Sequence, residues 1–128
     1  MQGESRLYDL EKLYEIDNKN KEFVSEIITV FLNSIPINAR DLVTAVDEER
    51  WDKVYFLAHK MKANIDLLNI KAIREEIRIV ERNAKTKTHL DQILDKAKFI
   101  NLIIQQCAKE LQEDFALNLH FDPKYNCN

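Results

Sequence analysis

The sequence predicts an all-α protein, and we expect an up-and-down four-helix bundle with an additional short N-terminal helix. Apolar residues recur three and four positions apart along nearly the whole chain, which is the period of a buried helix face. No stretch shows the strict alternation of a strand, and no internal repeat is present. The polar connections between the periodic stretches are short, which favours antiparallel neighbours in a bundle.

The first periodic stretch predicts a short helix over 9–16. A polar break follows, and the next helix begins at about Lys21. Pro36 favours the start of a new helix, because its missing N–H has no partner in a first turn anyway. We therefore predict one helix over 21–34 and another over 36–48.

The clearest apolar stripe predicts a helix over 51–68, and its inward residues are Trp51, Val54, Ala58, Met61, Ile65 and Leu68. Asn69 is expected to end this helix in the left-handed conformation, which asparagine tolerates. Two further helices are expected over 71–84 and 89–115, joined by a polar connector.

The 128 residues fit one domain with one core. We divide them into an N-terminal tail at 1–6, the helical bundle at 7–115 and a C-terminal tail at 116–128. The last segment contains Asp122-Pro123 and three asparagines and loses the helical period, so we expect it to be loosely ordered.

Composition excludes several classes of function. The chain has 19 basic and 22 acidic residues, and this net charge of −3 argues against nucleic acid as the main partner. No apolar run approaches the roughly 20 residues that span a membrane. Residues 1–8 contain no apolar signal core, so a cytoplasmic location is the default. Gly3 is the only glycine, which excludes glycine-rich phosphate-binding loops.

The cysteines and two of the three histidines carry no recognisable site. Cys107 falls in an apolar stripe and is expected to be buried, and Cys127 is too distant for a CxxC pair. A disulfide framework is therefore not expected, which agrees with a reducing compartment. His89 and His120 have no neighbours at metal-ligand spacing. We expect no metal and no cofactor.

His59 is the residue whose chemistry stands out, because the helical period places it on the outer face of its helix. At 100° per residue it lies roughly 140° from Val54, a core position. Phe56 and Ala63 flank it on the outward side, and Lys62 lies between it and the edge of the core. An imidazole is therefore expected on an exposed surface, one turn from a very small side chain.

This arrangement suits phosphoryl exchange. A neutral imidazole has a free ring nitrogen that can act as a nucleophile near pH 7. Lys62 would offset the charge of a phosphohistidine, and Ala63 would let a partner's active site close over the ring. The same pattern is also typical of a solvated helix face, and Tyr55 and Phe56 equally indicate an ordinary protein contact.

Four segments of the chain follow the order and spacing of a known family. Residues 58–63 (AHKMKA) are similar to the motif A-H-x-L-K-G, and residues 31–36 (FLNSIP) to F-L-x-x-x-P. Residues 45–51 (AVDEERW) are similar to A-L-x-x-x-D-W, and residues 73–81 (IREEIRIVE) to an L…L-E pattern. Over about 8–115, the chain thus resembles the histidine-containing phosphotransfer (HPt) domain of multistep two-component relays.

The resemblance implies a role for each matching residue. His59 would be the phosphorylated residue, reacting through Nε2, and Lys62 would steady the phosphoryl group. Glu81 matches the position that holds the other ring nitrogen, as a carboxylate does for a metal-bound histidine. Lys60 matches a variable position and would favour an acidic partner. The alternative for Glu81 is a surface glutamate paired with a nearby basic residue.

The chain departs from the family pattern at three positions. Ala63 replaces a glycine, which adds one methyl group and is expected to tune partner preference rather than prevent docking. Met61 replaces a leucine and stays apolar. Asn69 replaces a second glycine and can hold the same backbone conformation at some cost. None of these changes removes a chemical group, so we expect an active module.

The implied function is that of a phosphoryl carrier between receiver-domain aspartates, with no enzymatic activity of its own. Its expected partners are response-regulator receiver domains, with a hybrid sensor histidine kinase as a further candidate. A receiver would supply Mg²⁺, and the carrier is expected to be a monomer.

Two other functions remain open. The first is a non-catalytic helical adaptor that binds a partner through Tyr55, Phe56 and Ala63. The second is the dimerisation domain of a histidine kinase, which usually presents an H-E or H-D dipeptide. Lys60 follows His59 here, and no ATP-binding segment is present.

Overall fold

The fold, a computed structural model, is described over residues 6–16 and 20–115. The predicted tails therefore lie outside the described residues, apart from Arg6. Within them the chain is all-helical and contains no strand, as predicted. The α-helices are α1 (Glu11–Ile16), α2 (Lys21–Asp47), α3 (Trp51–Leu67), α4 (Arg74–Thr86) and α5 (Ile93–Asp114). Single 3₁₀ turns, η2 (Lys71–Ile73) and η3 (Leu90–Gln92), precede α4 and α5.

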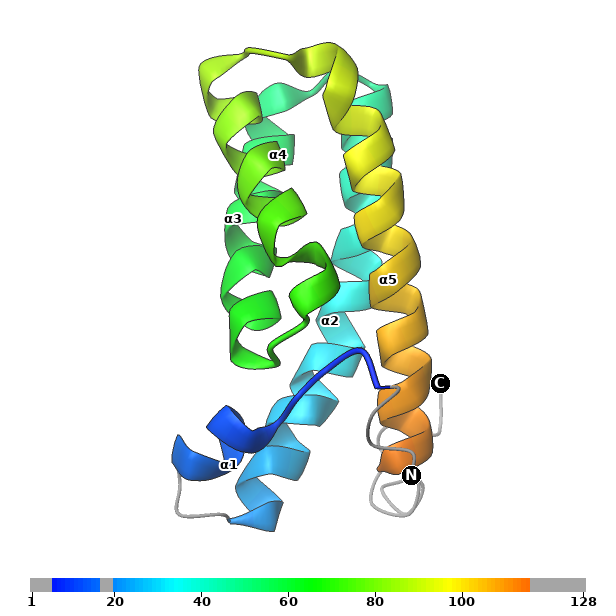
Figure 1. The fold of residues 1–128 in the computed structure, drawn as a ribbon. Coiled ribbons are helices and arrows are strands. Elements are labelled where there is room, and N and C mark those ends of the chain that lie inside the picture. Colours follow the sequence, from blue (N-terminus) through cyan, green and yellow to red (C-terminus); the bar gives the residue numbers. More distant parts are fainter. Residues whose placement is uncertain (1–5, 17–19, 116–128) are drawn as a thin grey trace.

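The four long helices lie side by side and alternate in direction (Figure 1). Each of them contacts two others: α2 packs on α3 and α5, and α4 also packs on α3 and α5. The short helix α1 lies against the first part of α2. This arrangement turns the apolar faces of all four long helices towards a common core.

The core follows the predicted apolar stripes. The α3 residues predicted to point inward are buried, with Trp51 packed at the margin of the core. The α5 stripe contributes Cys107, which is fully buried. Burial raises the pKa of the Cys107 thiol to about 12, with a smaller contribution from Glu110. The side chain therefore stays a neutral, apolar thiol at physiological pH, as predicted for a buried hydrophobe.

The predicted helix break at Pro36 is wrong, because α2 continues through the proline without interruption. A proline inside a helix loses one backbone hydrogen bond and clashes with the preceding turn, at a cost of about 3 kcal/mol. Here Pro36 is buried beside Ile35, in the part of α2 that packs on α5. Gln105 of α5 also donates from Nε2 to the Pro36 carbonyl at 2.9 Å. Packing against α5 thus favours a continuous helix where local preference favours a break.

The predicted end of α3 is confirmed, and the predicted start of α5 is wrong. Asn69 has a φ of 53° and follows the end of α3, as predicted for a left-handed stop. The last helix, predicted to start at His89, begins at Ile93 after a 3₁₀ turn. His89 itself has a φ of 49°, so its backbone cannot belong to a right-handed helix.

Residues 6–9 contact both the last turns of α5 and the connection between α3 and α4. Arg6, the last residue of the predicted N-terminal tail, forms an ion pair with Asp114 near the end of α5, with Nη2 2.7 Å from Oδ1. The backbone N–H of Leu7 donates to Glu110 Oε1 at 2.9 Å. The N–H of Asp9 donates to the carbonyl of Leu68, where α3 ends. The segment therefore crosses from α5 to the α3–α4 connection.

Asn69 allows a test of the turn between α3 and α4. A side chain with a Cβ atom pays about 1–2 kcal/mol in the left-handed region, and glycine pays almost nothing. We expect Asn69→Ala to lower the free energy of unfolding by about 1 kcal/mol, and Asn69→Gly to stay closer to wild type. Urea denaturation measures both. Equal stability of the two variants would contradict a left-handed backbone at this position.

Candidate functional site

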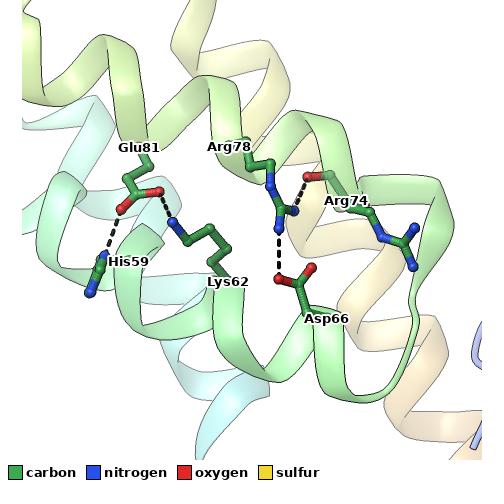
Figure 2. Close-up of polar contacts among 6 residues, drawn as sticks. All are labelled: His59, Lys62, Asp66, Arg74, Arg78 and Glu81. Carbon is green, nitrogen blue, oxygen red and sulfur yellow. Dashed lines mark hydrogen bonds and ion pairs between the residues drawn. The ribbon is translucent and has the colours of Figure 1, made fainter. Parts of the chain in front are cut away.

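The candidate site lies on the outer face of the α3–α4 pair (Figure 2). His59 stands in the middle of α3, and its side chain is 62% exposed, as the helical period predicts. Glu81 projects from α4 towards it, and Lys62 reaches the same carboxylate from one turn further along α3. The structure thus brings together the three residues that the HPt resemblance singled out.

One carboxylate holds two side chains of the neighbouring helix. Glu81 Oε2 lies 2.6 Å from His59 Nδ1, and Oε1 lies 2.8 Å from Lys62 Nζ. The Glu81 side chain is only 13% exposed, so both contacts are partly shielded from water. Charge-assisted hydrogen bonds of this length are stronger than neutral ones and define a single geometry.

The protonation of Glu81 follows from its surroundings. Burial of the carboxyl group is the largest influence and raises its pKa. The hydrogen bonds from Lys62 and His59, together with the charges of those two groups, act in the opposite direction and outweigh burial. The pKa of Glu81 therefore lies below its ordinary value, and the group is a carboxylate at neutral pH.

An ionised carboxylate can only accept hydrogen bonds. The proton between the two groups therefore resides on Nδ1 of His59, which donates to Glu81 Oε2. In the neutral imidazole this leaves the lone pair on Nε2. The site accordingly presents a ring of fixed tautomer with its nucleophilic nitrogen unblocked by Glu81.

Tyr55 contacts the imidazole from one turn earlier in α3. The two rings are stacked, with centroids 5.9 Å apart and an angle of 27° between their planes. Lys85 of α4 places its ammonium group 5.8 Å from the centre of the Tyr55 ring, within range of a cation–π contact. Tyr55, predicted only as a docking residue, therefore also contacts the imidazole itself. Its i, i+4 spacing from His59 was the signal that could have indicated the stacking.

The remaining predicted residues form the surface around the ring. Phe56 is 61% exposed, and Ala63 is exposed as well. Lys60 does not approach Glu81; its ammonium group lies 5.9 Å from the centre of the Phe56 ring. His59 is therefore bordered by an apolar ring, a methyl group and a positive charge, all open to a partner.

A second ion pair keeps α3 and α4 in register. Arg78 Nη2 contacts Asp66 Oδ2 at 2.7 Å, one turn from the Glu81 carboxylate (Figure 2). The hydrogen bond to Asp66 is the main cause of the raised pKa of Arg78. Arg78 also donates to the carbonyl of Arg74 in its own helix at 3.0 Å. Together the two bridges limit sliding of α4 along α3 and so keep Glu81 opposite His59.

Within residues 6–16 and 20–115, no group of three or more histidine, cysteine, aspartate or glutamate residues could hold a metal ion. No helix in this part of the chain combines the length and apolar character needed to cross a membrane. In comparisons with known proteins, no protein-family model, curated protein or solved structure matches the chain.

Glu81→Gln tests the charge of the bridge. Because the pKa of Glu81 is lowered in the folded state, its stabilising effect is present above the ordinary glutamate pKa of about 4.3 and is lost as pH falls through the lowered value. We expect the stability difference between wild type and Glu81→Gln to be largest near pH 7 and to shrink below about pH 4. Urea denaturation over this pH range measures it.

Glu75→Gln is the matched control, because Glu75 is an exposed glutamate of the same helix that forms no ion pair with the described residues. Its effect on stability should be small at every pH. If Glu75→Gln changed the free energy of unfolding with the same pH dependence as Glu81→Gln, the contacts of Glu81 with His59 and Lys62 would not be the cause of that dependence.

Proposed function

We propose that the protein is a histidine phosphocarrier of a two-component phosphorelay, in which His59 accepts a phosphoryl group from a receiver-domain aspartate and returns it to another. In this proposal α2 to α5 form an up-and-down four-helix bundle of the HPt type, with α1 as the additional helix. The observation that carries it is the Glu81 carboxylate, which orients the exposed imidazole through Nδ1 and leaves Nε2 free.

The transfer is a displacement at phosphorus. Nε2 of His59 attacks the phosphorus atom of an aspartyl phosphate, the N–P bond forms, and the P–O bond to the aspartate breaks. The aspartate leaves as a carboxylate, so no proton has to be delivered to the leaving group. The positive charge that develops on the imidazole ring is offset by Glu81, which keeps the Nδ1 proton hydrogen-bonded. The reverse transfer follows the same path.

Lys62 would stabilise the phosphoryl group once it is on the ring. In the present geometry its ammonium group is 2.8 Å from Glu81, one turn from His59 on α3. A phosphohistidine adds a dianionic group within reach of that side chain, and Lys62 can then share its hydrogen bonds between the phosphoryl oxygens and Glu81.

The surface around His59 suits a receiver's active site. A receiver surrounds its aspartate with an acidic pocket and its own Mg²⁺, which would belong to the partner. The exposed Phe56 ring supplies apolar contact, Ala63 leaves room for close approach, and Lys60 offers charge complementarity. We propose that the carrier acts as a cytoplasmic monomer and needs no cofactor of its own.

Transfer of labelled phosphate tests the proposal. Each receiver domain from the same genome is phosphorylated with ³²P and mixed with the carrier. We expect rapid label transfer to wild type, as acid-labile and base-stable phosphohistidine, and none to His59→Gln. Glu81→Gln should accept phosphate about 10²–10⁴-fold more slowly, because the ring loses both its fixed tautomer and its counter-charge.

His120→Gln is the control for non-specific labelling of histidine, and it should accept phosphate at the wild-type rate. Retained labelling of His59→Gln would refute the site. Failure of every receiver to label the wild-type protein would refute the function.

The adaptor function stays as the second candidate, because Phe56 places a largely exposed apolar ring beside Tyr55 and Ala63 on this face. In that case the face formed by Tyr55, Phe56 and Ala63 would bind a partner without any phosphate chemistry. Binding of a receiver that is abolished by Phe56→Ala but never accompanied by phosphorylation of His59 would favour the adaptor.

A further inference from the structure

A groove between α4 and α5 lies away from the His59 site and is lined by a different set of side chains. Its volume is about 590 Å³, which is in the size range of small-molecule sites. It is found where α4 ends and the chain turns back into α5 (Figure 1). Its lining consists of Ile79, Arg82, Asn83, Thr86, Thr88, His89, Gln92 and Lys96.

The charge of this lining is entirely positive. Arg82 and Lys96 contribute two cations, and no carboxylate lines the groove. The acidic residues adjacent in sequence to the lining, Glu81, Asp91 and Asp95, are outside it, and the Glu81 carboxylate is held by His59 and Lys62. In a chain with a net charge of −3, such a local excess of positive charge attracts anions against the overall field.

Arg82 is also exceptional among the arginines. Within the described residues, each of the other five arginine side chains contacts a polar side chain, namely Asp114, Gln105, Glu48, Asn69 and Asp66 in turn. Arg82 has no such partner in that part of the chain. Its guanidinium group therefore keeps its full hydrogen-bonding capacity for a ligand.

Asn83 also lines the groove and is only 6% exposed. Its side-chain amide adds a neutral polar group to the lining and leaves the positive charge of the lining unchanged. The hydroxyl groups of Thr86 and Thr88 are 2.7 Å apart on the same lining, and Thr86 donates to the carbonyl of Arg82, so this end of the groove is polar.

We propose that this groove binds a small phosphate-bearing anion. Phosphate oxygens accept hydrogen bonds from the forked N–H groups of a guanidinium and from the ammonium group of a lysine, and Arg82 and Lys96 bring these two kinds of donor to one groove. The lining has no aromatic ring on which a base could stack. The ligand class is therefore an inorganic polyphosphate or a phosphorylated small metabolite rather than a nucleobase-dependent ligand.

Pyrophosphate is the first probe, added to the full chain while backbone and side-chain NMR signals are followed at constant ionic strength. We expect saturable shifts at Arg82, Asn83 and Lys96, with no matching change at His59. A sugar monophosphate in a second titration distinguishes a phosphorylated metabolite from an inorganic polyphosphate by which of the two binds more tightly. Sulfate should bind more weakly than both.

Matched variants locate the site. Arg82→Gln and Lys96→Gln should each weaken pyrophosphate binding about tenfold, since each removes one charge-assisted hydrogen bond. Lys98→Gln, two residues further along α5 and outside the groove, should leave the affinity unchanged. Both tested side chains are at least partly exposed, so the fold should tolerate their replacement.

Shifts that do not saturate, or an equal loss with Lys98→Gln, would overturn the proposal, as would equal affinity for sulfate. Saturable shifts confined to His59 and Lys62 would overturn it too. None of these outcomes depends on phosphotransfer through His59.

Discussion

The ion pair between α3 and α4 that centres on Glu81 is the contact on which the geometry of the candidate site and the proposed chemistry depend. A single carboxylate accepts hydrogen bonds from His59 Nδ1 and Lys62 Nζ, at 2.6 and 2.8 Å. The Glu81 carboxylate is shielded from water, which strengthens its hydrogen bond to Nδ1. The imidazole is exposed, and Glu81 leaves its other nitrogen, Nε2, unblocked. An exposed histidine without this partner would exchange tautomers and ring orientations freely, and its nucleophilic nitrogen would have no fixed direction.

Contacts elsewhere in the fold support the spacing between α3 and α4 at which Glu81 reaches His59. The Asp66–Arg78 pair adds a second contact between α3 and α4, and the left-handed Asn69 stands in the tight connection between them. On the far side, α2 continues through Pro36 and packs on both α3 and α5. The residues of the candidate site therefore belong to helices rather than to loops, and helices hold side chains within the small positional tolerance that the proposed transfer between proteins requires.

Sequence patterns predict the parts of this molecule that depend on local spacing. The 3.6-residue period alone places His59 outward, because its angle to the core residues is set by helix geometry. Glu81 lies 22 residues further along, and only the resemblance to HPt domains indicated its approach to the ring. Pro36 was misjudged since its local preference is opposed by burial and by a hydrogen bond from α5, neither of which a local pattern contains. The groove at Arg82 is likewise absent from any local pattern, because its lining comes from two helices and their connection.

The tautomer of His59 tests the central claim most directly. Long-range ¹H–¹⁵N correlation NMR at a pH where the ring is neutral distinguishes the nitrogen that carries the proton from the one that carries the lone pair. The account predicts that Nδ1 is protonated and Nε2 is not in wild type, and that Glu81→Gln gives a mixture of both forms. A neutral His59 that carries its proton mainly on Nε2 in the wild-type protein would contradict it, because the nitrogen assigned to attack phosphorus would then have no free lone pair.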